Sequence, residues 1–277
     1  MRINLITDSA CELSESMQKA TNRLLIPFSI NIGDKSYVDD GSIDLPEMRK
    51  VMKEYDGVPK TAAPSPYDFL NAFEKGAESF AVTISSSLSA TYSNAMLAKK
   101  MAEEKGNRLI HVFDSKSAVC GETIIVHKIK ELIDLGLQFN EIVEKVESFI
   151  ETSRTVFVLE SLDNLMKNGR MSKLAGFFAN VLSIKPVLTA DENGEIKLVE
   201  KTRGLKKAHS KLVELIGNDK ELLKERLLVI THCNAAKAAE NIKDEIVSLY
   251  NPKEVQILET GGLSTIYADN GGIVIAY

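Results

Sequence analysis

The 277-residue chain contains no tryptophan and only three cysteines, Cys11, Cys120 and Cys233, which are odd in number and far apart. A disulfide framework needs paired cysteines and a structural zinc site needs closely spaced ligands, so the pattern fits neither. No apolar run approaches the ~18 residues of a transmembrane helix, and the strand-like run Ile3–Thr7 leaves no room for a signal peptide before it. We therefore expect a protein of the reducing cytoplasm, without a bound metal.

Sequence motifs for nucleotides, metals and nucleophilic catalysis are absent as well. The chain has no G-x-x-x-x-G-K-[ST] loop, no G-x-G-x-x-G, no G-x-S-x-G, no H-E-x-x-H and no C-x-x-C. No serine or cysteine has a histidine at a spacing that would identify a catalytic pair. The sequence thus predicts no cofactor, and we assign no catalytic residue.

The net charge of −5 argues against a general nucleic-acid-binding protein, which would carry a basic excess over one face. Locally the balance differs, because residues 154–217 contain 11 Lys and Arg residues against 7 Asp and Glu residues. This basic region is either a solvated face or a surface for phosphate or an acidic partner. Spacing alone does not decide between these two interpretations.

The length predicts two α/β domains, since a single core usually serves about 150 residues. Residues 1–153 alternate β-branched runs with amphipathic stretches, which predicts a three-layer α/β/α domain with a largely parallel sheet. Its expected strands are Ile3–Thr7, Leu24–Ile32, Phe80–Ile84 and Arg108–Phe113, and its expected helices are Ser14–Thr21, Leu45–Tyr55, Pro66–Lys75, Ala90–Lys105, Ala118–Leu135 and Glu141–Thr152.

Residues 154–277 predict a second α/β domain, with a mixed sheet. A first strand is followed by two short helical pieces, the second beginning after Ser172, and Asn193-Gly194 between alternating runs predicts a hairpin. The expected strands are Thr155–Leu159, Ile184–Thr189, Glu195–Glu200, Leu227–Thr231, Glu254–Glu259 and Gly272–Tyr277, and the expected helices are Leu205–Ile216 and Ala236–Tyr250.

A serine-rich segment, Ser85 to Tyr92, follows an apolar strand and opens a helix. A helix N-terminus favours an anionic group by about 0.3–1 kcal/mol, and ligands of open α/β sheets bind beyond the carboxyl ends of the strands. A carboxylate or phosphate site and a purely capping loop both remain open. Asp8 and Asp114 end two other strands, each beside a serine hydroxyl on the same kind of turn, and the preferred interpretation is that each only caps the next helix.

Two arginines of the second half follow tight connections, Arg170 after Gly169 and Arg203 before Gly204. Arginine is suited to bidentate contact with carboxylate or phosphate, although each arginine taken alone reads as a surface charge. Earlier in the chain, Ser65, Pro66 and Asp68 predict a capped helix start just after Thr61.

Taken together, these segments resemble the DegV family. The matching motifs occur in order along essentially the whole chain: Thr61 with Pro64-Ser65-Pro66, Ser86 to Tyr92, Asp114-Ser115, Leu162 to Leu165 running into Gly169 to Ser172, and Lys185-Pro186. The resemblance implies a fatty acid held within and between two α/β domains, with its carboxylate bonded by the motif hydroxyls. It also implies an ATP-binding kinase subunit related to dihydroxyacetone kinases, which phosphorylates the bound carboxylate to an acyl phosphate.

Carried onto this chain, the resemblance makes Thr61 and Ser89 the carboxylate ligands, within a loop that also contains Ser87 and Ala90. It makes Arg170 and Arg203 cations near the head group, where the kinase would dock. Two positions depart from the family pattern. Ala90 stands where the family usually has glycine, so its methyl group would narrow the approach to the ligand. Tyr267 stands where the family has a head-group histidine.

The leading interpretation is a carrier of one fatty acid of about 14 to 18 carbons, whose burial gains about 0.8 kcal/mol per CH₂ group. A stand-alone phosphotransferase or hydrolase that uses the serine loop is the alternative enzyme, and a lipid-sensing regulatory module is the third interpretation. The sequence leaves transient contact with a membrane surface open.

Overall fold

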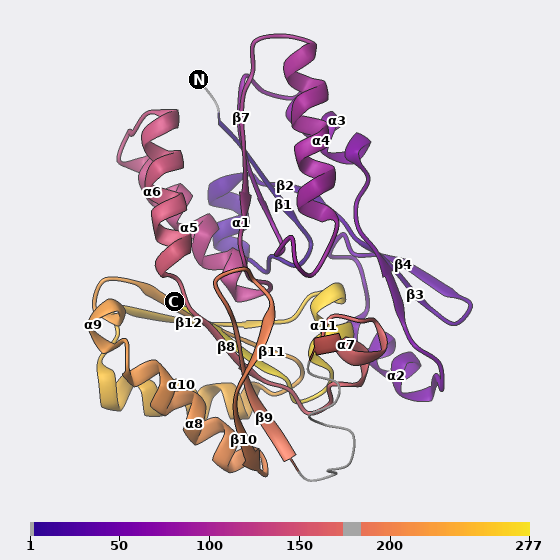
Figure 1. The fold of residues 1–277 in the computed structure, drawn as a ribbon, viewed down its shortest axis with the longest axis vertical. Helices are drawn as coiled ribbons and strands as arrows, with labels where there is room; N and C mark the ends of the chain where they lie inside the picture. The colour runs from indigo at the N-terminus through magenta and orange to yellow at the C-terminus, as the bar shows by residue number, and fades with distance from the viewer. Residues whose placement is uncertain (1–2, 174–183) are drawn as a thin grey trace.

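The computed structural model describes residues 3–173 and 184–277. Its first sheet has four parallel strands in the order β2-β1-β6-β7, which run through the upper half of the molecule in Figure 1. The strands are β1 (Ile3–Asp8), β2 (Leu24–Ile26), β6 (Glu78–Thr83) and β7 (Leu109–Asp114). The predicted parallel sheet is confirmed.

Helices cover both faces of this sheet. Side chains such as Ile6 and Ala81 pack on one face against α3 and α4, while Leu5 and Phe80 pack on the other against α5 and α6. The helices of this half are α1 (Glu15–Thr21), α2 (Leu45–Glu54), α3 (Pro66–Phe73), α4 (Thr91–Glu104), α5 (Cys120–Asp134) and α6 (Phe139–Thr152). This arrangement confirms the three-layer α/β/α unit.

The second sheet has six strands in the order β10-β9-β8-β13-β11-β12. Only β11 and β12 pair in parallel, so the predicted mixed sheet is also confirmed. The strands are β8 (Thr155–Val158), β9 (Ile184–Ala190), β10 (Ile196–Arg203), β11 (Leu227–His232), β12 (Glu254–Glu259) and β13 (Ile273–Ala276). Two helices, α8 (Leu205–Gly217) and α10 (Ala236–Tyr250), cover one face.

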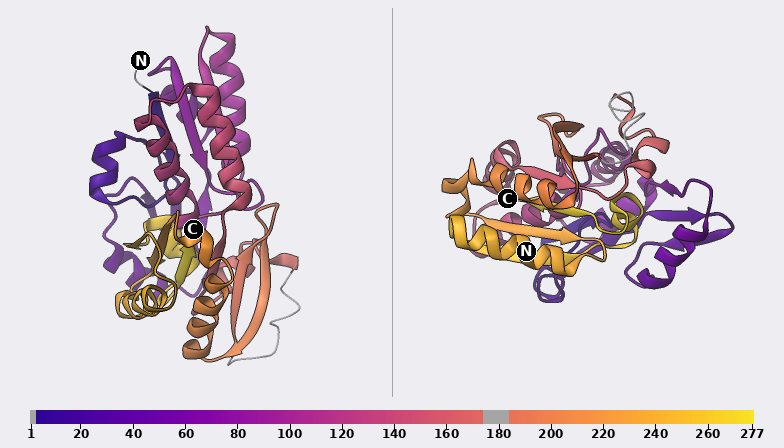
Figure 2. Two further views of the ribbon diagram at one scale, coloured as in Figure 1. Left: turned by 90° about the vertical axis from the view of Figure 1, so that its left-hand side faces the viewer. Right: turned by 90° about the horizontal axis from the view of Figure 1, so that it is seen from below.

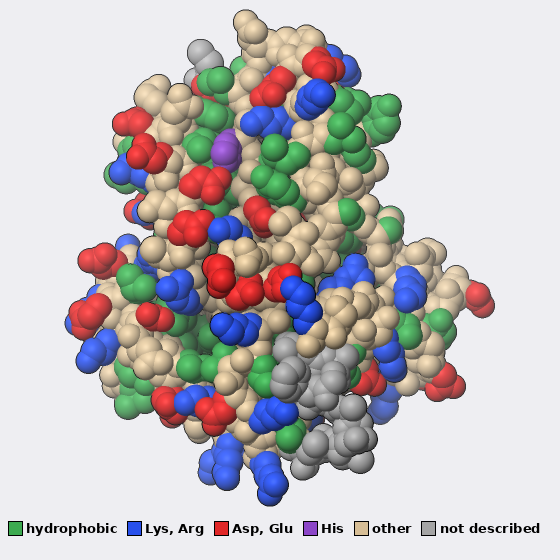
Figure 3. Space-filling model, viewed as in Figure 1, with side chains coloured by type: hydrophobic (Ala, Val, Ile, Leu, Met, Phe, Trp, Pro, Cys, Tyr) green, Lys and Arg blue, Asp and Glu red, His purple; other side chains and the backbone are tan. Residues whose placement is uncertain are grey.

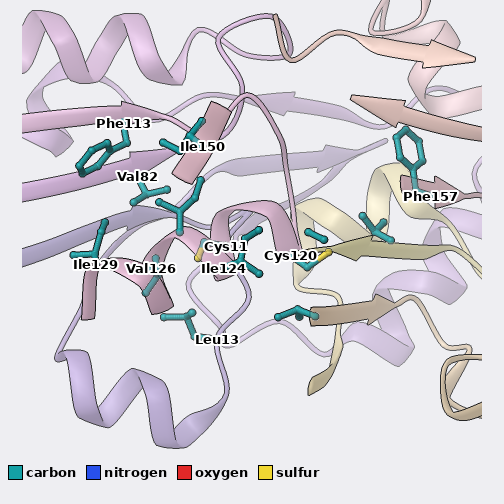
Figure 4. Close-up of a cluster of buried hydrophobic side chains, with 14 of the residues drawn as sticks. Cys11, Leu13, Val82, Phe113, Cys120, Ile124, Val126, Ile129, Ile150 and Phe157 are labelled. Carbon is teal, nitrogen blue, oxygen red and sulfur yellow. The ribbon is translucent and has the colours of Figure 1, made fainter. Parts of the chain in front are cut away.

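Helix α5 lies between the two sheets. Every residue from Cys120 to Val126 is buried, and the core around α5 includes Phe113 of the first sheet and Phe157 of the second. Figure 4 shows these side chains converging from both sheets, and the views in Figure 2 show the two halves packed closely. The three cysteines are buried and free.

One expected strand, Leu24–Ile32, is wrong. The structure divides it at Pro27-Phe28 into β2 and β3, and β3 joins a separate three-stranded sheet of order β4-β3-β5. Proline has no amide hydrogen for a strand ladder, so it ends the pairing with the first sheet. The three strands of the added sheet are β3 (Ser29–Ile32), β4 (Lys35–Val38) and β5 (Lys60–Ala62).

Three short helices complete the described elements, α7 (Asp163–Lys167), α9 (Lys220–Leu223) and α11 (Gly262–Ala268), of which α9 and α11 are not predicted from the sequence. The remaining predicted elements match within three residues at each end. The helical piece expected after Ser172 falls largely at 174–183, outside the described residues. Within 3–173 and 184–277, no helix is long and apolar enough to cross a bilayer.

Candidate functional site

A largely apolar cavity lies beside the N-terminal end of α5, between the two sheets. Both halves of the chain contribute to its wall. The apolar lining residues are Ala10, Phe28, Ile84, Leu88, Ala118, Val119, Phe157, Leu159, Leu165, Ala190, Ile196, Leu263, Ala268 and Val274. A wall of this composition stabilises an apolar ligand by roughly 25 cal/mol for each Å² of apolar surface that leaves water.

Polar side chains line the same cavity, and four of them, Thr61, Ser89, Arg170 and Tyr267, are residues that the sequence singled out. The Oγ1 of Thr61 lies 2.7 Å from the Oη of Tyr267, although 206 positions separate the two residues. The Arg170 guanidinium lies 5.8 Å from the centre of the Tyr267 ring, within the range of a cation–π interaction. The fold therefore places two hydroxyls and a cation together.

The position of Thr61 in the cavity wall is set by strand pairing, and that of Ser89 by hydrogen bonds within its loop. Thr61 lies opposite Ile30 in the antiparallel pair of β5 and β3, so the unpredicted small sheet positions this hydroxyl. Ser89 precedes α4, where its Oγ accepts a hydrogen bond from the Thr91 amide at 3.3 Å and lies 2.8 Å from the Thr91 Oγ1. The hydroxyl of Ser89 thus bonds to the first residue of α4 and also lies in the cavity wall.

Two strand-end carboxylates hold the serine loop in place. Asp8 accepts a hydrogen bond from the Ile84 amide at 2.8 Å, and Asp114 accepts one from the Ser86 amide at 3.1 Å. Neither carboxylate caps the next helix, contrary to our expectation, because Ser14 caps α1 and α5 begins without a side-chain cap. Instead, their contacts fix the loop that delivers Ser89.

Arg170 is held by backbone carbonyls on two sides. Its Nε donates to the Leu88 carbonyl at 3.2 Å, and its terminal nitrogen donates to the Asn168 carbonyl at 2.6 Å. Gly169, at φ +78°, permits the tight turn that brings Arg170 back toward the cavity. Because Leu88 directly precedes Ser89, the first contact ties the arginine to the serine loop.

Four carboxyl side chains, Asp8, Glu12, Asp39 and Glu122, are buried. Burial raises the pKa of Asp8 to about 6 and that of Glu12 to about 8, and backbone amides that donate to both carboxyls oppose the shift. Burial likewise raises the pKa of Asp39, and that of Glu122 well above its usual range. Glu12 and Glu122 therefore hold protons at a pH where exposed carboxyls have lost theirs.

Val119, in the cavity wall, has a backbone conformation that is rare for a β-branched residue. Its φ is +59° and its ψ is −126°, immediately before α5. Such a conformation costs on the order of 1–3 kcal/mol and persists where the surroundings enforce it, often at ligand sites. Here it directs the Val119 side chain into the core around α5.

A family model described as an uncharacterised protein of the DegV family matches residues 2–277. The chain belongs to the DegV family. A DegV domain-containing protein of Streptococcus pneumoniae strain R6 is 35% identical, and the match covers 100% of this chain and 99% of that protein. A second such protein, from Streptococcus pyogenes serotype M3, is also 35% identical, with the same coverage.

Solved structures of DegV proteins are similar over nearly the whole chain. A DegV family protein of Ruminococcus gnavus with vaccenic acid is 34% identical, with a TM-score of 0.95 and coverage of 100% and 99%. The fatty acid kinase (Fak) B3 protein of Streptococcus pneumoniae, loaded with linoleic acid, is 34% identical, with a TM-score of 0.93 and coverage of 100% and 99%. A Eubacterium eligens DegV protein loaded with heptadecanoic acid is 32% identical, with a TM-score of 0.91 and coverage of 99% and 98%.

In this DegV chain, Ser87 and Ala90 do not line the apolar cavity. Both are exposed and border a polar depression on the surface, which shares Ser89 and Arg170 with the cavity. Ser87 donates its hydroxyl to the Asn193 carbonyl at 2.8 Å. Ala90 lies outside the cavity wall and borders the depression, so the expected narrowing of the approach to the ligand stays a prediction.

Arg203 is not brought to the polar end of the DegV cavity. It ends β10, whose other end carries the cavity residue Ile196, and seven residues of strand span roughly 20 Å. Arg203 instead borders an exposed basic area with Lys206 and Lys207. Figure 3 shows Lys and Arg side chains projecting at this lower end of the molecule, where β10 ends and α8 begins.

Sequence reasoning missed several lining residues of this DegV site. Ser264 lies on the unpredicted α11, and Ser117 and Thr155 face each other at 2.7 Å between their hydroxyls. Gly194, at the tip of the β9–β10 hairpin, accepts a hydrogen bond from Ser85 at 2.9 Å. The Asn-Gly signal predicts this hairpin, but nothing in its spacing indicates that its tip closes over the serine loop.

Proposed function

We propose that this protein binds one long-chain fatty acid in the apolar cavity, with the carboxylate at the Thr61–Tyr267 pair. The observation that carries the proposal is the convergence of Thr61, Tyr267, Ser89 and Arg170 in the wall of a cavity whose lining is otherwise mostly apolar. A buried carboxylate must be met by hydrogen bonds or charge, and these side chains supply both.

The energetics support a tightly held acyl chain. Burial gains about 0.8 kcal/mol for each CH₂ group, so a chain of about 14 to 18 carbons outweighs the cost of association. Three DegV proteins that are 32–34% identical to this chain were solved with vaccenic, heptadecanoic or linoleic acid. Their ligands have the chemistry that this cavity wall favours.

The finer part of the proposal is that the protein presents the carboxylate to a separate ATP-binding kinase subunit, related to dihydroxyacetone kinases, for acyl-phosphate formation. The polar depression that shares Ser89 and Arg170 with the cavity supports this step, because it leads from the proposed head group to the surface. Similarity to a fatty acid kinase B3 protein supports it too.

We also propose that the protein works in the cytoplasm. We place the boundary between its two domains near residue 153.

A stand-alone hydrolase or phosphotransferase receives less support. Such an enzyme needs a general base beside its nucleophile. Among the hydrogen bonds of the described residues, Ser87 bonds to the Asn193 carbonyl and Ser89 to Thr91, and neither bonds to a histidine or a carboxylate. We therefore assign the phosphoryl transfer to the partner.

The two parts of the proposal can be tested separately. Calorimetric titration with oleate measures binding without a partner. Incubation with oleate, ATP and the kinase subunit from the same genome, followed by trapping with hydroxylamine, measures acyl phosphate. We expect saturable binding at one site and hydroxamate only when both proteins are present. Binding without hydroxamate would contradict the carrier role and leave the binding role intact.

A further inference from the structure

Helix α11 presents two polar residues to the cavity, Ser264 and Tyr267, and it has only seven residues. A helix this short does not hold its own conformation in water, so its orientation depends on contacts with the rest of the fold. The position of the Tyr267 hydroxyl therefore depends on what fixes the ends of α11.

The N-terminal end of α11 is held by a carboxylate from the other half of the chain. Asp39, which directly follows β4, accepts a hydrogen bond from the Gly262 amide at 2.9 Å through Oδ1 and one from the Leu263 amide at 2.8 Å through Oδ2. Asp39 is only 4% exposed. Both oxygens of one buried carboxylate thus bind the first turn of the helix, where free amides favour negative charge.

The sequence of α11 suits this contact. A Cβ atom at position 262 would lie 2.4 Å from the Oδ1 of Asp39, so only glycine allows the carboxylate to approach this closely. The preceding amide, of Gly261, donates to Glu12 at 3.0 Å. Gly261 is the N-cap residue and Gly262 the first residue of α11, so both carboxyl side chains accept from amides that have no partner within the helix.

The C-terminal end is held by Asn164, on α7. Its Nδ2 donates to the Ile266 carbonyl at 2.7 Å, and Ile266 directly precedes Tyr267. The side chains of Asp39 and Asn164 therefore bind the backbone of α11 at its two ends. Between them, the Tyr267 hydroxyl lies 2.7 Å from the Thr61 hydroxyl.

We propose that Asp39 and Asn164 are positioning residues of the head-group site, which clamp α11 so that Tyr267 stays at hydrogen-bonding distance from Thr61. The inference rests on the proposed fatty-acid function. Neither residue lines the cavity, so each acts through α11. A hydrogen bond weakens steeply when its geometry changes, so a small displacement of the helix costs the contact.

The test uses isosteric variants of the full chain. Asp39→Asn replaces one acceptor oxygen by an NH₂ group that faces a backbone amide, and Asn164→Asp replaces the donor by an acceptor. We expect each variant to weaken oleate binding about tenfold, the effect of one lost hydrogen bond to a charged group. Asp40→Asn is the matched control, because the side chain of Asp40 is exposed and, among the hydrogen bonds of the described residues, bonds only to Ser42.

A double-mutant comparison separates positioning from general stability. In a Tyr267→Phe background, Asp39→Asn should change oleate affinity less than about twofold, because the group that it positions is gone. An equal loss in both backgrounds would overturn the proposal, as would a lower unfolding temperature with unchanged affinity. If Asp39→Asn does not fold, Asn164→Asp in the same two backgrounds decides.

Amide hydrogen exchange of the lipid-free protein provides a readout that does not depend on the ligand. Exchange at Gly262, Leu263 and Tyr267 should become faster in both variants and stay unchanged in Asp40→Asn. If the wild type does not bind oleate, the proposed function fails, and faster exchange at Tyr267 still supports the clamp. Unchanged exchange at Tyr267 would contradict the clamp whether or not lipid binds.

Discussion

Hydroxyl groups supply most of the polar contacts at the Thr61–Tyr267 end of the cavity, from Thr61, Ser89 and Tyr267. A hydroxyl can donate to a carboxylate without the large desolvation cost of burying a second full charge. Arg170 adds a positive charge whose guanidinium is already bonded to two backbone carbonyls. The residues are thus suited to hold a monovalent anion at the end of an apolar chain.

Removing these hydroxyls should weaken head-group binding. Thr61→Val and Ser89→Ala each delete one donor to a charged acceptor, a change worth about 1.5–3 kcal/mol, or roughly 10- to 150-fold in Kd. Displacement of a fluorescent fatty acid measures the change. Thermal unfolding of the lipid-free variants should stay within a few degrees of wild type. An unchanged Kd in the double variant would place the head group elsewhere.

The two arginines should behave differently, since only Arg170 lines the cavity. Arg170→Gln should weaken oleate binding by up to about tenfold, because it removes a partly buried positive charge next to the carboxylate. Arg203→Gln, on the exposed basic area, should leave the Kd within about twofold and serves as the matched control. Parallel calorimetric titrations compare them, and a larger loss for Arg203→Gln would contradict the proposed head-group position.

At the scale of elements, the alternation of β-branched and amphipathic runs predicts both main sheets and most helices. Local chemistry explains the misses. Pro27 interrupts a continuous apolar run, and the strands β4 and β5 are short and largely exposed. The two-residue Gly33-Asp34 turn, with Gly33 at φ +59°, is a hairpin signal that could have revealed β3 and β4.

The head-group site was predictable only in part. Thr61, Ser89 and Tyr267 come from the resemblance to the DegV family, while the spacing of single residues leaves their roles open. Helix α11 escapes prediction because Gly261 and Gly262 open it, and its stabilising partners Glu12 and Asp39 are more than 200 residues away. Contacts of this range appear only once the chain is folded.

Glu12 should make the stability of the protein depend on pH. Its ordinary pKa of 4.5 rises to about 8 in the folded protein, chiefly through burial. The folded state therefore holds a proton that the unfolded state releases above about pH 4.5. This contribution to stability is complete below that pH and is lost as the pH rises through about 8, at about 1.4 kcal/mol per unit of pKa shift.

Glu12→Gln isolates this effect, because the amide can still accept from the Gly261 amide but does not titrate. We expect wild type and variant to unfold at similar temperatures near pH 5, and the variant to be more stable near pH 8.5. Differential scanning fluorimetry across that range measures the gap. Glu15→Gln, at an exposed position on α1, should show no such gap. A gap that grows toward low pH would contradict the assignment.

At the scale of the whole molecule, α5 packs against both sheets, and the cavity begins where this helix begins. Residues from the loops that follow the strands of the first sheet and residues from the strands of the second sheet together form the cavity wall. An empty apolar cavity lacks the packing contacts that a close-packed interior normally makes. An acyl chain would restore those contacts, so we expect the protein to keep its ligand through purification.

Mass spectrometry of protein purified without added lipid tests this claim most directly. We expect the native mass to exceed the denatured mass by one fatty acid of about 14 to 18 carbons, and denaturation to release that acid. Equal native and denatured masses, together with no binding of added palmitate or oleate, would contradict it.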